Sequence, residues 1–183
     1  LARAKQREGK LNHDTLVVTV MSNLGLILAM RDHDIRTVQT GVGDRYVLEK
    51  MLAGGYTLGG EQSGHVIDTI HATTGDGVLT SLRVAARLKR SGKPLGELAS
   101  IVQRLPQTLV NVRGVDKDAA GTDSGVQDAV AAAEKRLGET GRVLLRGSGT
   151  EPLVRVMVEA ATQEEADAAA ADLAAVVKDR LAL

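Results

Sequence analysis

The feature that most constrains the fold is an alternation of short β-branched apolar runs with amphipathic helical segments over residues 1–105. Residues 16–20 read Leu-Val-Val-Thr-Val, which predicts a strand buried on both faces. Further strands are expected over 35–40, 56–60 and 66–71, and helices over 24–32, 44–53, 77–90 and 95–104. Strands that alternate with helices are typical of a layered α/β domain.

The order of elements changes near Pro106. The pattern then predicts a strand at 109–112, a turn-rich stretch at 114–123, a helix at 124–137, strands at 142–146 and 153–159, and a last helix to about Leu181. Thr162 and Glu165 have the spacing of a capping box at the start of that last helix. This β-α-β-β-α order predicts a small α+β domain, so we expect one domain at 1–105 and a second at 106–183.

For two segments, the pattern also predicts which side chains face the core and which face solvent. The helix at 77–90 is expected to turn inward the side chains of Val78, Leu82, Ala85 and Leu88. In the strand at 153–159, three valines alternate with Arg155, Met157 and Glu159. That alternation predicts a half-exposed antiparallel strand.

The composition is that of an ordinary globular protein and excludes several classes of function. Apolar residues make up 43% of the chain, and 23 basic residues balance 23 acidic ones, so net charge steers the chain neither to nucleic acid nor to a membrane surface. The two aromatic residues argue against base stacking, and the absence of cysteine excludes disulfides. No run is long enough to span a bilayer and no signal peptide is visible, so a cytoplasmic location is expected. The first residue is Leu rather than Met, which suggests a fragment and leaves a removed leader open.

The loop Gly59–His65 lies between two short expected strands and carries four hydrogen-bonding side chains between glycines. A carboxylate near a hydroxyl can clamp vicinal sugar hydroxyls, because Glu61 accepts hydrogen bonds while Ser63 donates or accepts them. His65 could bind phosphate as a cation or move a proton. The alternative interpretation is a polar surface turn with a satisfied histidine.

The loop Arg146–Pro152 combines an arginine with two glycines and two hydroxyl residues. Its backbone N–H groups could converge on phosphate oxygens, and the planar fork of Arg146 suits bidentate phosphate binding. Arg155, on the polar face of the next strand, could add charge. The alternative is a Gly-Ser hairpin turn, although the loop is longer than a minimal hairpin requires.

Two further turns lead into expected helices. Gly41–Arg45 has the glycines of a phosphate-binding turn at a helix N-terminus but lacks the P-loop lysine, and the favoured interpretation is that Asp44 caps the helix. Asp76, in the turn Thr73–Gly77, is expected to be a cap. The four histidines lack metal-ligand spacing, so no metal site is expected in this chain.

The loops Gly60–His65 and Arg146–Pro152 together resemble the α-D-phosphohexomutase family. The stretches Val20–Gly25, Gly43–Val47 and Thr73–Gly77 resemble the branch of that family that acts on an amino-sugar phosphate. The five stretches occur in the family's order and cover nearly the whole chain. The family has four domains, and the resemblance covers the third, truncated at its N-terminus, and the fourth, which is TATA-box-binding-protein-like.

The resemblance implies a role for each loop. Sugar contacts would come from Asp44, Gly60, Glu61, Gln62 and Ser63. Phosphate contacts would come from Arg146, Gly147, Ser148, Gly149, Thr150 and Arg155. His65 and Arg45 are candidates for a catalytic role, His65 as an acid or base or as a phosphate contact. Gly147 stands where relatives often carry a larger residue, which predicts a looser loop with its donors intact.

The implied reaction is phosphoryl transfer between an enzyme phosphoserine and glucosamine 6-phosphate. A bisphosphate intermediate would turn around and give glucosamine 1-phosphate, a precursor of UDP-N-acetylglucosamine and peptidoglycan. The family places the phosphoserine in its first domain and the Mg²⁺ loop in its second, so this chain lacks both. The resemblance therefore implies the missing N-terminal domains as partners, Mg²⁺ and a glucose or glucosamine 1,6-bisphosphate-type activator for the whole protein, and an inactive isolated chain.

Several alternatives stay open at this stage. The chain could belong to a mutase of the same family that acts on mannose or glucose phosphates. It could also be a non-catalytic sugar-phosphate-binding protein, if the chain is complete in the cell. A homodimer is compatible with the sequence.

Overall fold

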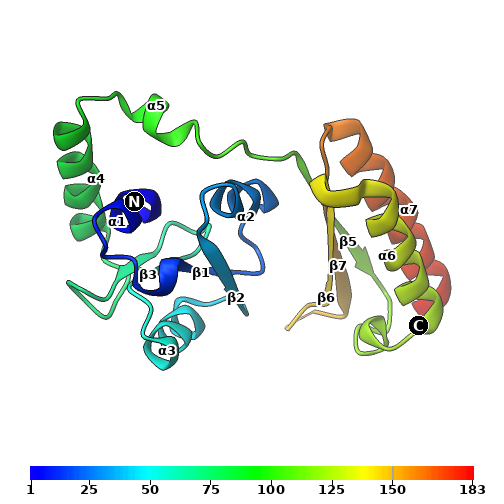
Figure 1. Ribbon diagram of the computed structural model, residues 1–183. Coiled ribbons are helices and arrows are strands. Elements are labelled where there is room, and N and C mark those ends of the chain that lie inside the picture. Colours follow the sequence, from blue (N-terminus) through cyan, green and yellow to red (C-terminus); the bar gives the residue numbers. More distant parts are fainter. Residues whose placement is uncertain (150) are drawn as a thin grey trace. The chain divides into compact units, whose positions relative to one another are not determined.

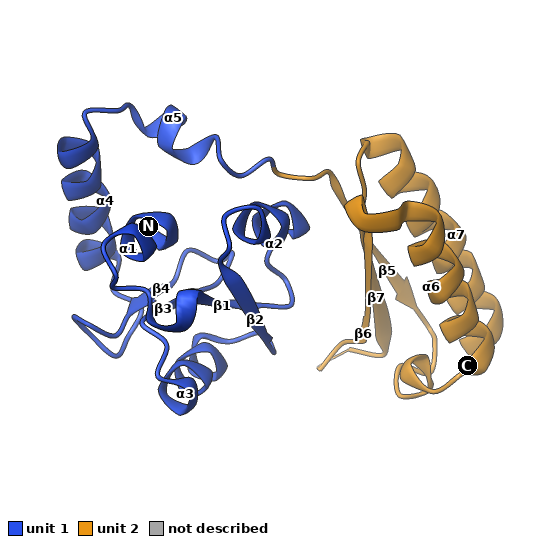
Figure 2. Ribbon diagram, viewed as in Figure 1, with its two compact units in different colours: residues 1–103 blue, residues 104–183 orange. Residues whose placement is uncertain are grey.

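The computed structural model describes residues 1–149 and 151–183 (Figure 1). The chain divides into two compact units, residues 1–103 and residues 104–183 (Figure 2). Among the described residues, no helix is both long enough and apolar enough to cross a membrane.

The first unit is built on a four-stranded sheet with the order β2-β1-β3-β4. Its strands are β1 (Thr15–Thr19), β2 (Arg36–Thr40), β3 (Leu58–Gly60) and β4 (Val66–Asp68). Its helices are α1 (Ala2–Arg7), α2 (Leu24–Arg31), α3 (Asp44–Gly54), α4 (Gly77–Ser91) and α5 (Leu95–Ala99), with a 3₁₀ turn η1 (Asn12–Asp14). β1 pairs in parallel with β2 and β3, whereas β4 is antiparallel to β3.

The sheet is covered on both faces, which confirms the predicted double burial of β1. Leu16 and Val18 pack in one apolar cluster with residues of α1 and α2. Val17 points to the opposite face and packs with Val47 and Met51 of α3. Figure 1 shows α1 and α2 on one side of the sheet and α3 on the other. Parallel strands need such cover because neither face can be left to water.

Local signals placed several helix ends correctly in this unit, but α5 ends at Ala99 rather than at the expected position 104. Asn23 caps α2 by accepting from the Gly25 N–H, and Asp76 caps α4 by accepting from the Leu79 N–H at 2.9 Å. Gly55 ends α3 in the left-handed conformation. Asp44, by contrast, does not cap α3. Gly43 occupies the cap position, and Asp44 is the first helical residue.

The prediction for the inner face of α4 is wrong. The helix and its cap form as expected, but Val78 is 73% exposed and Leu82 is 64% exposed. Ala85 is exposed as well, and Leu88 is only partly buried. Apolar residues at helical spacing predict the helix, but they do not predict what covers its apolar stripe. That cover depends on residues distant in sequence. In the part of the chain that the structure describes, the stripe stays open to solvent.

The second unit is an antiparallel three-stranded sheet with the order β5-β7-β6, covered on one face by two helices. Its strands are β5 (Gln107–Arg113), β6 (Arg142–Gly147) and β7 (Leu153–Glu159). Its helices are α6 (Ser124–Leu137) and α7 (Gln163–Leu181), with 3₁₀ turns η2 (Ala119–Gly121) and η3 (Gly138–Thr140). The three valines of β7 share a core with both helices, which lie side by side in Figure 1. The two units confirm the predicted layered α/β domain followed by a small α+β domain.

Two predictions at β7 have different outcomes. The capping box of Thr162 and Glu165 at the start of α7 is present in both directions. The predicted half-exposure of β7 is wrong, because Met157 is 1% exposed and Glu159 is fully buried. β7 is the central strand, so side chains of β5 and β6 flank it on both sides. Arg142 of β6 is the register partner of Glu159 and forms an ion pair with it.

An ion pair between α6 and α7 predicts how stability depends on pH. Asp123 accepts from the Arg180 Nε at 2.6 Å and from the Val126 N–H at 2.9 Å. The Arg180 hydrogen bond, then the backbone one, lowers the pKa of Asp123 to about 2. A pKa depressed in the folded state stabilises the fold above the unfolded value of about 3.9, and that contribution is lost as pH falls toward 2.

We therefore expect Arg180→Met to lower the Tm at pH 6, with a difference from wild type that shrinks between pH 4 and pH 2. Thermal unfolding over that pH range measures it, with Arg136→Met as the control on the same pair of helices. A difference that stays constant down to pH 2 would contradict the role of the ionised Asp123 carboxylate.

Candidate functional site

The loop that joins β3 to β4 is closed by its own backbone. The Glu61 N–H donates to the His65 carbonyl at 2.9 Å, and the Gly64 N–H donates to the Glu61 carbonyl at 3.2 Å. Gly64 has a φ of +102°, which favours glycine. A Cβ on Gly60 would lie 2.7 Å from the His65 carbonyl oxygen, so only glycine permits this closure. These contacts hold the loop and the side chains that it carries from Glu61 to His65.

Three of these side chains form one polar cluster. The Ser63 hydroxyl donates to Glu61 Oε2 at 2.9 Å and lies 3.3 Å from His65 Nδ1. His65 Nδ1 is 3.5 Å from the same Glu61 oxygen. The Glu61 side chain is 9% exposed, whereas that of His65 is 54% exposed. The cluster is thus a largely buried carboxylate with a hydroxyl and an imidazole at its rim.

The second oxygen of Glu61 reaches another loop. Glu61 Oε1 accepts from the Gly43 N–H at 2.6 Å. Gly43 has a φ of +134°, and a Cβ there would lie 3.1 Å from the Tyr46 ring. The two loops that the sequence singled out in this unit are therefore joined through one carboxylate. The sequence did not reveal this contact, because it links residues that are 18 positions apart.

Asp44 and Arg45 make only local contacts in this structure. Asp44 accepts from the Arg45 N–H at 2.8 Å. Arg45 Nε donates to Glu49 Oε1 at 2.7 Å, one helical turn along α3. This hydrogen bond and the charge of Glu49 raise the pKa of Arg45. Among the described residues, no hydrogen bond or ion pair brings either side chain to the Glu61 cluster.

A cavity of about 410 Å³ opens beside this cluster. It is lined by Ser22, Asn23, Gly60, Glu61 and Gln62 and by apolar residues that include Leu16, Val18 and Leu58. These polar residues follow the carboxyl ends of β1 and β3. Ligands of open α/β sheets bind at that edge of the strands. Sequence reasoning used Ser22 and Asn23 only as part of a resemblance and as a cap, and missed this position.

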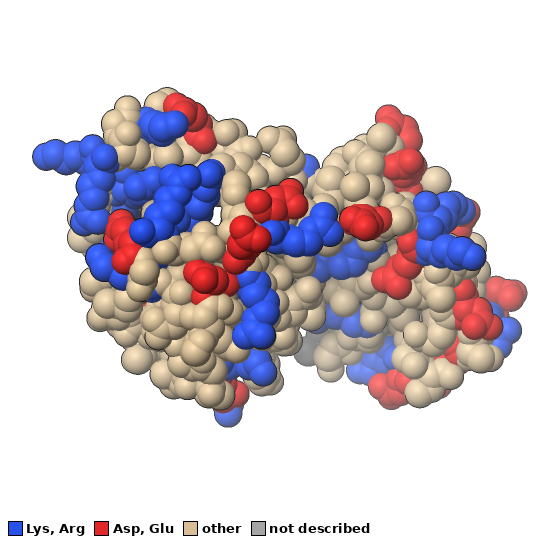
Figure 3. All heavy atoms as spheres, viewed as in Figure 1, with Lys and Arg blue, Asp and Glu red and all other residues tan. Residues whose placement is uncertain are grey.

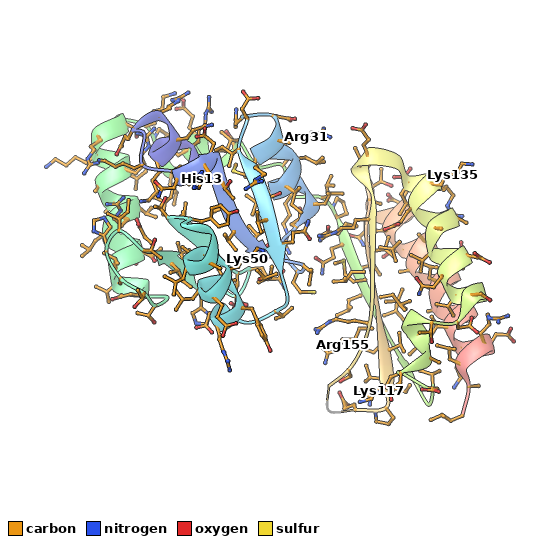
Figure 4. All side chains as sticks on the ribbon, turned by 60° about the horizontal axis from the view of Figure 1, so that its bottom comes forward. His13, Arg31, Lys50, Lys117, Lys135 and Arg155 are labelled. Carbon is orange, nitrogen blue, oxygen red and sulfur yellow. The ribbon has the colours of Figure 1, made fainter. Side chains whose placement is uncertain are left out.

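In the second unit, Arg146 and Arg155 are register partners on neighbouring strands. Because Val154 and Val156 face the helices, the two arginines share the opposite face of the sheet. Both are partly buried, and the buried Nε of Arg155 has no hydrogen-bond partner among the described residues. Figure 4 shows Arg155 on β7. Like charges that lie directly opposite destabilise a sheet, so this pair favours a bound anion.

The loop between β6 and β7 uses part of its hydrogen-bonding capacity internally. The Ser148 N–H donates to the Leu153 carbonyl at 2.9 Å, and the buried Ser148 hydroxyl accepts from the Glu151 N–H at 3.3 Å. The expected convergence of successive N–H groups on an anion therefore does not include that of Ser148. Gly149 is exposed, and its N–H donates no hydrogen bond to an acceptor within the described residues. Thr150, the other predicted hydroxyl donor of this loop, lies outside the described residues.

A basic surface on the first unit was not expected from the balanced net charge. Figure 3 shows Lys and Arg gathered over α1 and α4. Two cavities at these helices are lined by Arg3, Lys5, Arg7, Arg83, Arg87, Arg90 and Lys93, together with the acidic side chains of Glu8 and Glu97. Equal numbers of basic and acidic residues do not show how the charges are distributed over the surface. Within the described residues, no group of three or more acidic or histidine side chains could hold a metal ion, so these residues do not fit a magnesium site.

Two family models match the chain. The model of the phosphoglucomutase/phosphomannomutase alpha/beta/alpha domain III matches residues 1–105, and that of the C-terminal domain of the same family matches residues 109–176. The chain therefore belongs to the phosphoglucomutase/phosphomannomutase family.

The similar curated proteins point to one branch of this family. The chain is 67% identical over 183 residues to the phosphoglucosamine mutase of Bifidobacterium longum subsp. infantis, and 64% identical to that of Cutibacterium acnes. These matches cover all of this chain but only 40% and 41% of the relatives.

Solved structures share the fold. An N-acetylphosphoglucosamine mutase of Aspergillus fumigatus, in complex with GlcNAc-6P and magnesium, matches with a TM-score of 0.78 and 23% identity over 97% of this chain and 41% of that one. A phosphomannomutase-like protein of Thermus thermophilus matches with a TM-score of 0.60 and 24% identity, over 97% of this chain and 39% of that one.

Proposed function

We propose that the chain is the sugar- and phosphate-recognising part of a mutase that interconverts glucosamine 6-phosphate and glucosamine 1-phosphate. The observation that carries this proposal is the Glu61–Ser63–His65 cluster at the carboxyl edge of the parallel strands. Its presence in a chain 67% identical to a phosphoglucosamine mutase favours an amino sugar over mannose or glucose.

The cluster suits a sugar that is bound in two opposite orientations. Glu61 Oε2 now accepts from the Ser63 hydroxyl, and a sugar hydroxyl can take the place of that donor. Ser63 is then free to bond a neighbouring hydroxyl. Gly60 and Gln62 lie at the rim of the adjoining cavity, and Asp44 follows the Gly43 contact at the start of α3. Hydroxyl recognition of this kind needs no aromatic platform, in keeping with a chain that holds two tyrosines.

The phosphate is assigned to the second unit. Arg146 and Arg155 supply two guanidinium groups on one face of the sheet, and the bidentate fork of an arginine matches two phosphate oxygens. Gly147, Ser148, Gly149 and Thr150 complete the loop. Ser148 would contribute its hydroxyl proton, because its N–H is already used.

The remaining chemistry belongs to the whole protein in this proposal. Phosphoryl transfer depends on positioning and electrostatics, which these residues provide for the sugar and the distal phosphate. His65, half-exposed beside the carboxylate, could move a proton or contact phosphate. The phosphoserine, Mg²⁺ and the bisphosphate activator would act with N-terminal domains beyond these residues, in the cytoplasm.

Replacing Glu61 tests the sugar role. We expect Glu61→Ala to weaken binding of glucosamine 6-phosphate about tenfold or more, and to leave binding of inorganic phosphate nearly unchanged. Glu61→Gln keeps a carbonyl acceptor for the Gly43 N–H, so it separates the sugar contact from the loop contact. Calorimetric titration of both variants gives the affinities, with the exposed Glu134→Ala on α6 as control. Equal loss for both ligands would contradict a sugar-specific role.

The isolated chain is expected to show no mutase activity, because the serine and metal loops implied by the family lie outside it. A coupled assay with Mg²⁺ and glucose 1,6-bisphosphate measures the conversion of glucosamine 1-phosphate. Turnover above background by the purified chain would show that these residues suffice for the reaction, and would overturn the assignment of the chemistry to other domains.

A further inference from the structure

A lysine from a different part of the second unit lies directly beneath the β6–β7 loop. Lys117 Nζ donates to the Ser148 carbonyl at 2.8 Å. The loop backbone also packs closely on this residue, since a Cβ on Gly147 would lie 3.1 Å from the Lys117 carbonyl oxygen and 3.2 Å from its Cβ. Figure 4 shows Lys117 at the end of the sheet where β6 and β7 are joined. Because Gly147 has no side chain, Lys117 can pack closely against the loop backbone.

The segment that carries Lys117 is itself firmly held. The Asp116 N–H donates to the Leu181 carbonyl at 2.8 Å, and Val115, which is 1% exposed, bridges to Ala182. The Asp116 carboxylate accepts from the N–H groups of the two residues after Lys117, Asp118 and Ala119. The Gly114 N–H donates to the Pro152 carbonyl at 3.3 Å. Lys117 thus projects from a rigid support that is tied to both the C-terminal helix and the loop.

The Lys117 contact fixes the direction of one backbone donor. In a trans peptide, the C=O of one residue and the N–H of the next point in opposite directions. Among the described residues, no peptide bond is cis. Because Lys117 holds the Ser148 carbonyl, the Gly149 N–H points away from the lysine. An ammonium group on the carbonyl also polarises that peptide, which makes its N–H a stronger donor.

The local charge balance favours an anion at this end of the sheet. The loop's own carboxylate, Glu151, is paired with Arg113 at 3.0 Å. Asp116 and Asp118 keep their negative charges beside Lys117, because hydrogen bonds from neutral backbone N–H groups do not cancel the charge of a carboxylate. Lys117 and the Arg146–Arg155 pair outnumber these two carboxylates, so the charge around the loop is positive.

We propose that Lys117 is a positioning residue for the phosphate loop: it aims the Gly149 N–H at the phosphate and adds positive charge behind it. This inference rests on the phosphate role proposed above for the loop. Lys117 contacts the loop backbone, so it acts through Gly149 rather than as a ligand of the phosphate.

The test compares Lys117→Met, which removes the charge, with Lys117→Arg, which keeps it. Inorganic phosphate is the probe, and Arg146→Ala and the exposed Lys135→Met on α6 are the reference variants. Calorimetry gives the affinity, and the ¹H–¹⁵N signal of Gly149 reports its donor. We expect about tenfold weaker phosphate binding in Lys117→Met, recovery of most of that loss in Lys117→Arg, and wild-type affinity in Lys135→Met.

The spectroscopic readout distinguishes this role from a merely structural one. In the wild-type chain, phosphate should move the Gly149 amide signal strongly, and Lys117→Met should reduce that movement with little change in Tm. A Gly149 signal that phosphate leaves in place in the wild type overturns the inference without any variant. Wild-type affinity in Lys117→Met together with weak binding in Arg146→Ala overturns the role of Lys117 alone. Wild-type affinity in both overturns the phosphate role of the loop as well.

Discussion

Arg146→Ala is expected to weaken binding of both glucosamine 6-phosphate and inorganic phosphate by roughly tenfold to a hundredfold or more. Arg146 lies beside Arg155 on the face of the sheet opposite the helices. Hydrogen bonds to charged groups contribute about 1.5–3 kcal/mol each, and a guanidinium can make two to one phosphate. Lysine cannot reproduce that fork, so Arg146→Lys should recover only part of the affinity.

Stability should change little in Arg146→Ala, because the substitution also relieves repulsion from its register partner Arg155. Arg136→Ala, on the exposed surface of α6, is the matched control for loss of an arginine. Calorimetric titration with both ligands measures the effect. If Arg146→Ala remains folded and binds both ligands as wild type does, the phosphate role of this loop is wrong.

Arg142→Met is expected to have the largest effect on stability, a loss of about 3–5 kcal/mol in the free energy of unfolding. Arg142 Nη2 lies 2.7 Å from the Glu159 carboxylate, and the Glu159 side chain is 0% exposed. Removing one member of a buried ion pair is strongly destabilising, because the remaining buried charge loses the opposite charge that lies against it. Urea unfolding of the variant measures the loss.

The double variant Arg142→Met, Glu159→Met is the control for this prediction. An apolar pair can replace a buried ion pair at little cost, so the double variant should recover most of the stability lost in the single one. If the single variant is as stable as wild type, the buried Glu159 does not depend on Arg142.

Local chemistry explains which parts of the fold could be predicted from the sequence. β1 carries a run of β-branched residues too continuous for a half-exposed strand, and it is buried on both faces. Asn23, Asp76 and the Thr162–Glu165 capping box each act within three residues of their own helix start, so their effect depends little on the rest of the chain.

Faces that depend on distant elements could not be predicted in the same way. The apolar stripe of α4 has the period of a buried face, yet Val78 is exposed. The alternation in β7 is typical of an edge or one-sided strand, yet the position between β5 and β6 buries Glu159. Periodicity reports which residues share a face, whereas burial is decided by what packs there.

In the candidate site, too, local features could be predicted and contacts between distant residues could not. Residue types and glycines identified the loops Gly59–His65 and Arg146–Pro152 as candidates, and the sugar and phosphate roles remain proposals. The contacts that organise these loops join distant positions, Gly43 to Glu61 and Lys117 to Ser148. No local pattern signals such pairs, because one partner in each pair is a backbone group, which the residue type does not reveal.

The central claim is that the first unit recognises the sugar and the second unit the phosphate. Its most direct test is a ¹H–¹⁵N titration of the 183-residue chain with glucosamine 6-phosphate and, separately, with inorganic phosphate. Glucosamine 6-phosphate should move the amide signals of residues 60–65 and of 147–149, whereas inorganic phosphate should move those of 147–149 alone. Signals of both loops that stay in place while others move, or a phosphate response confined to the first unit, would contradict the claim.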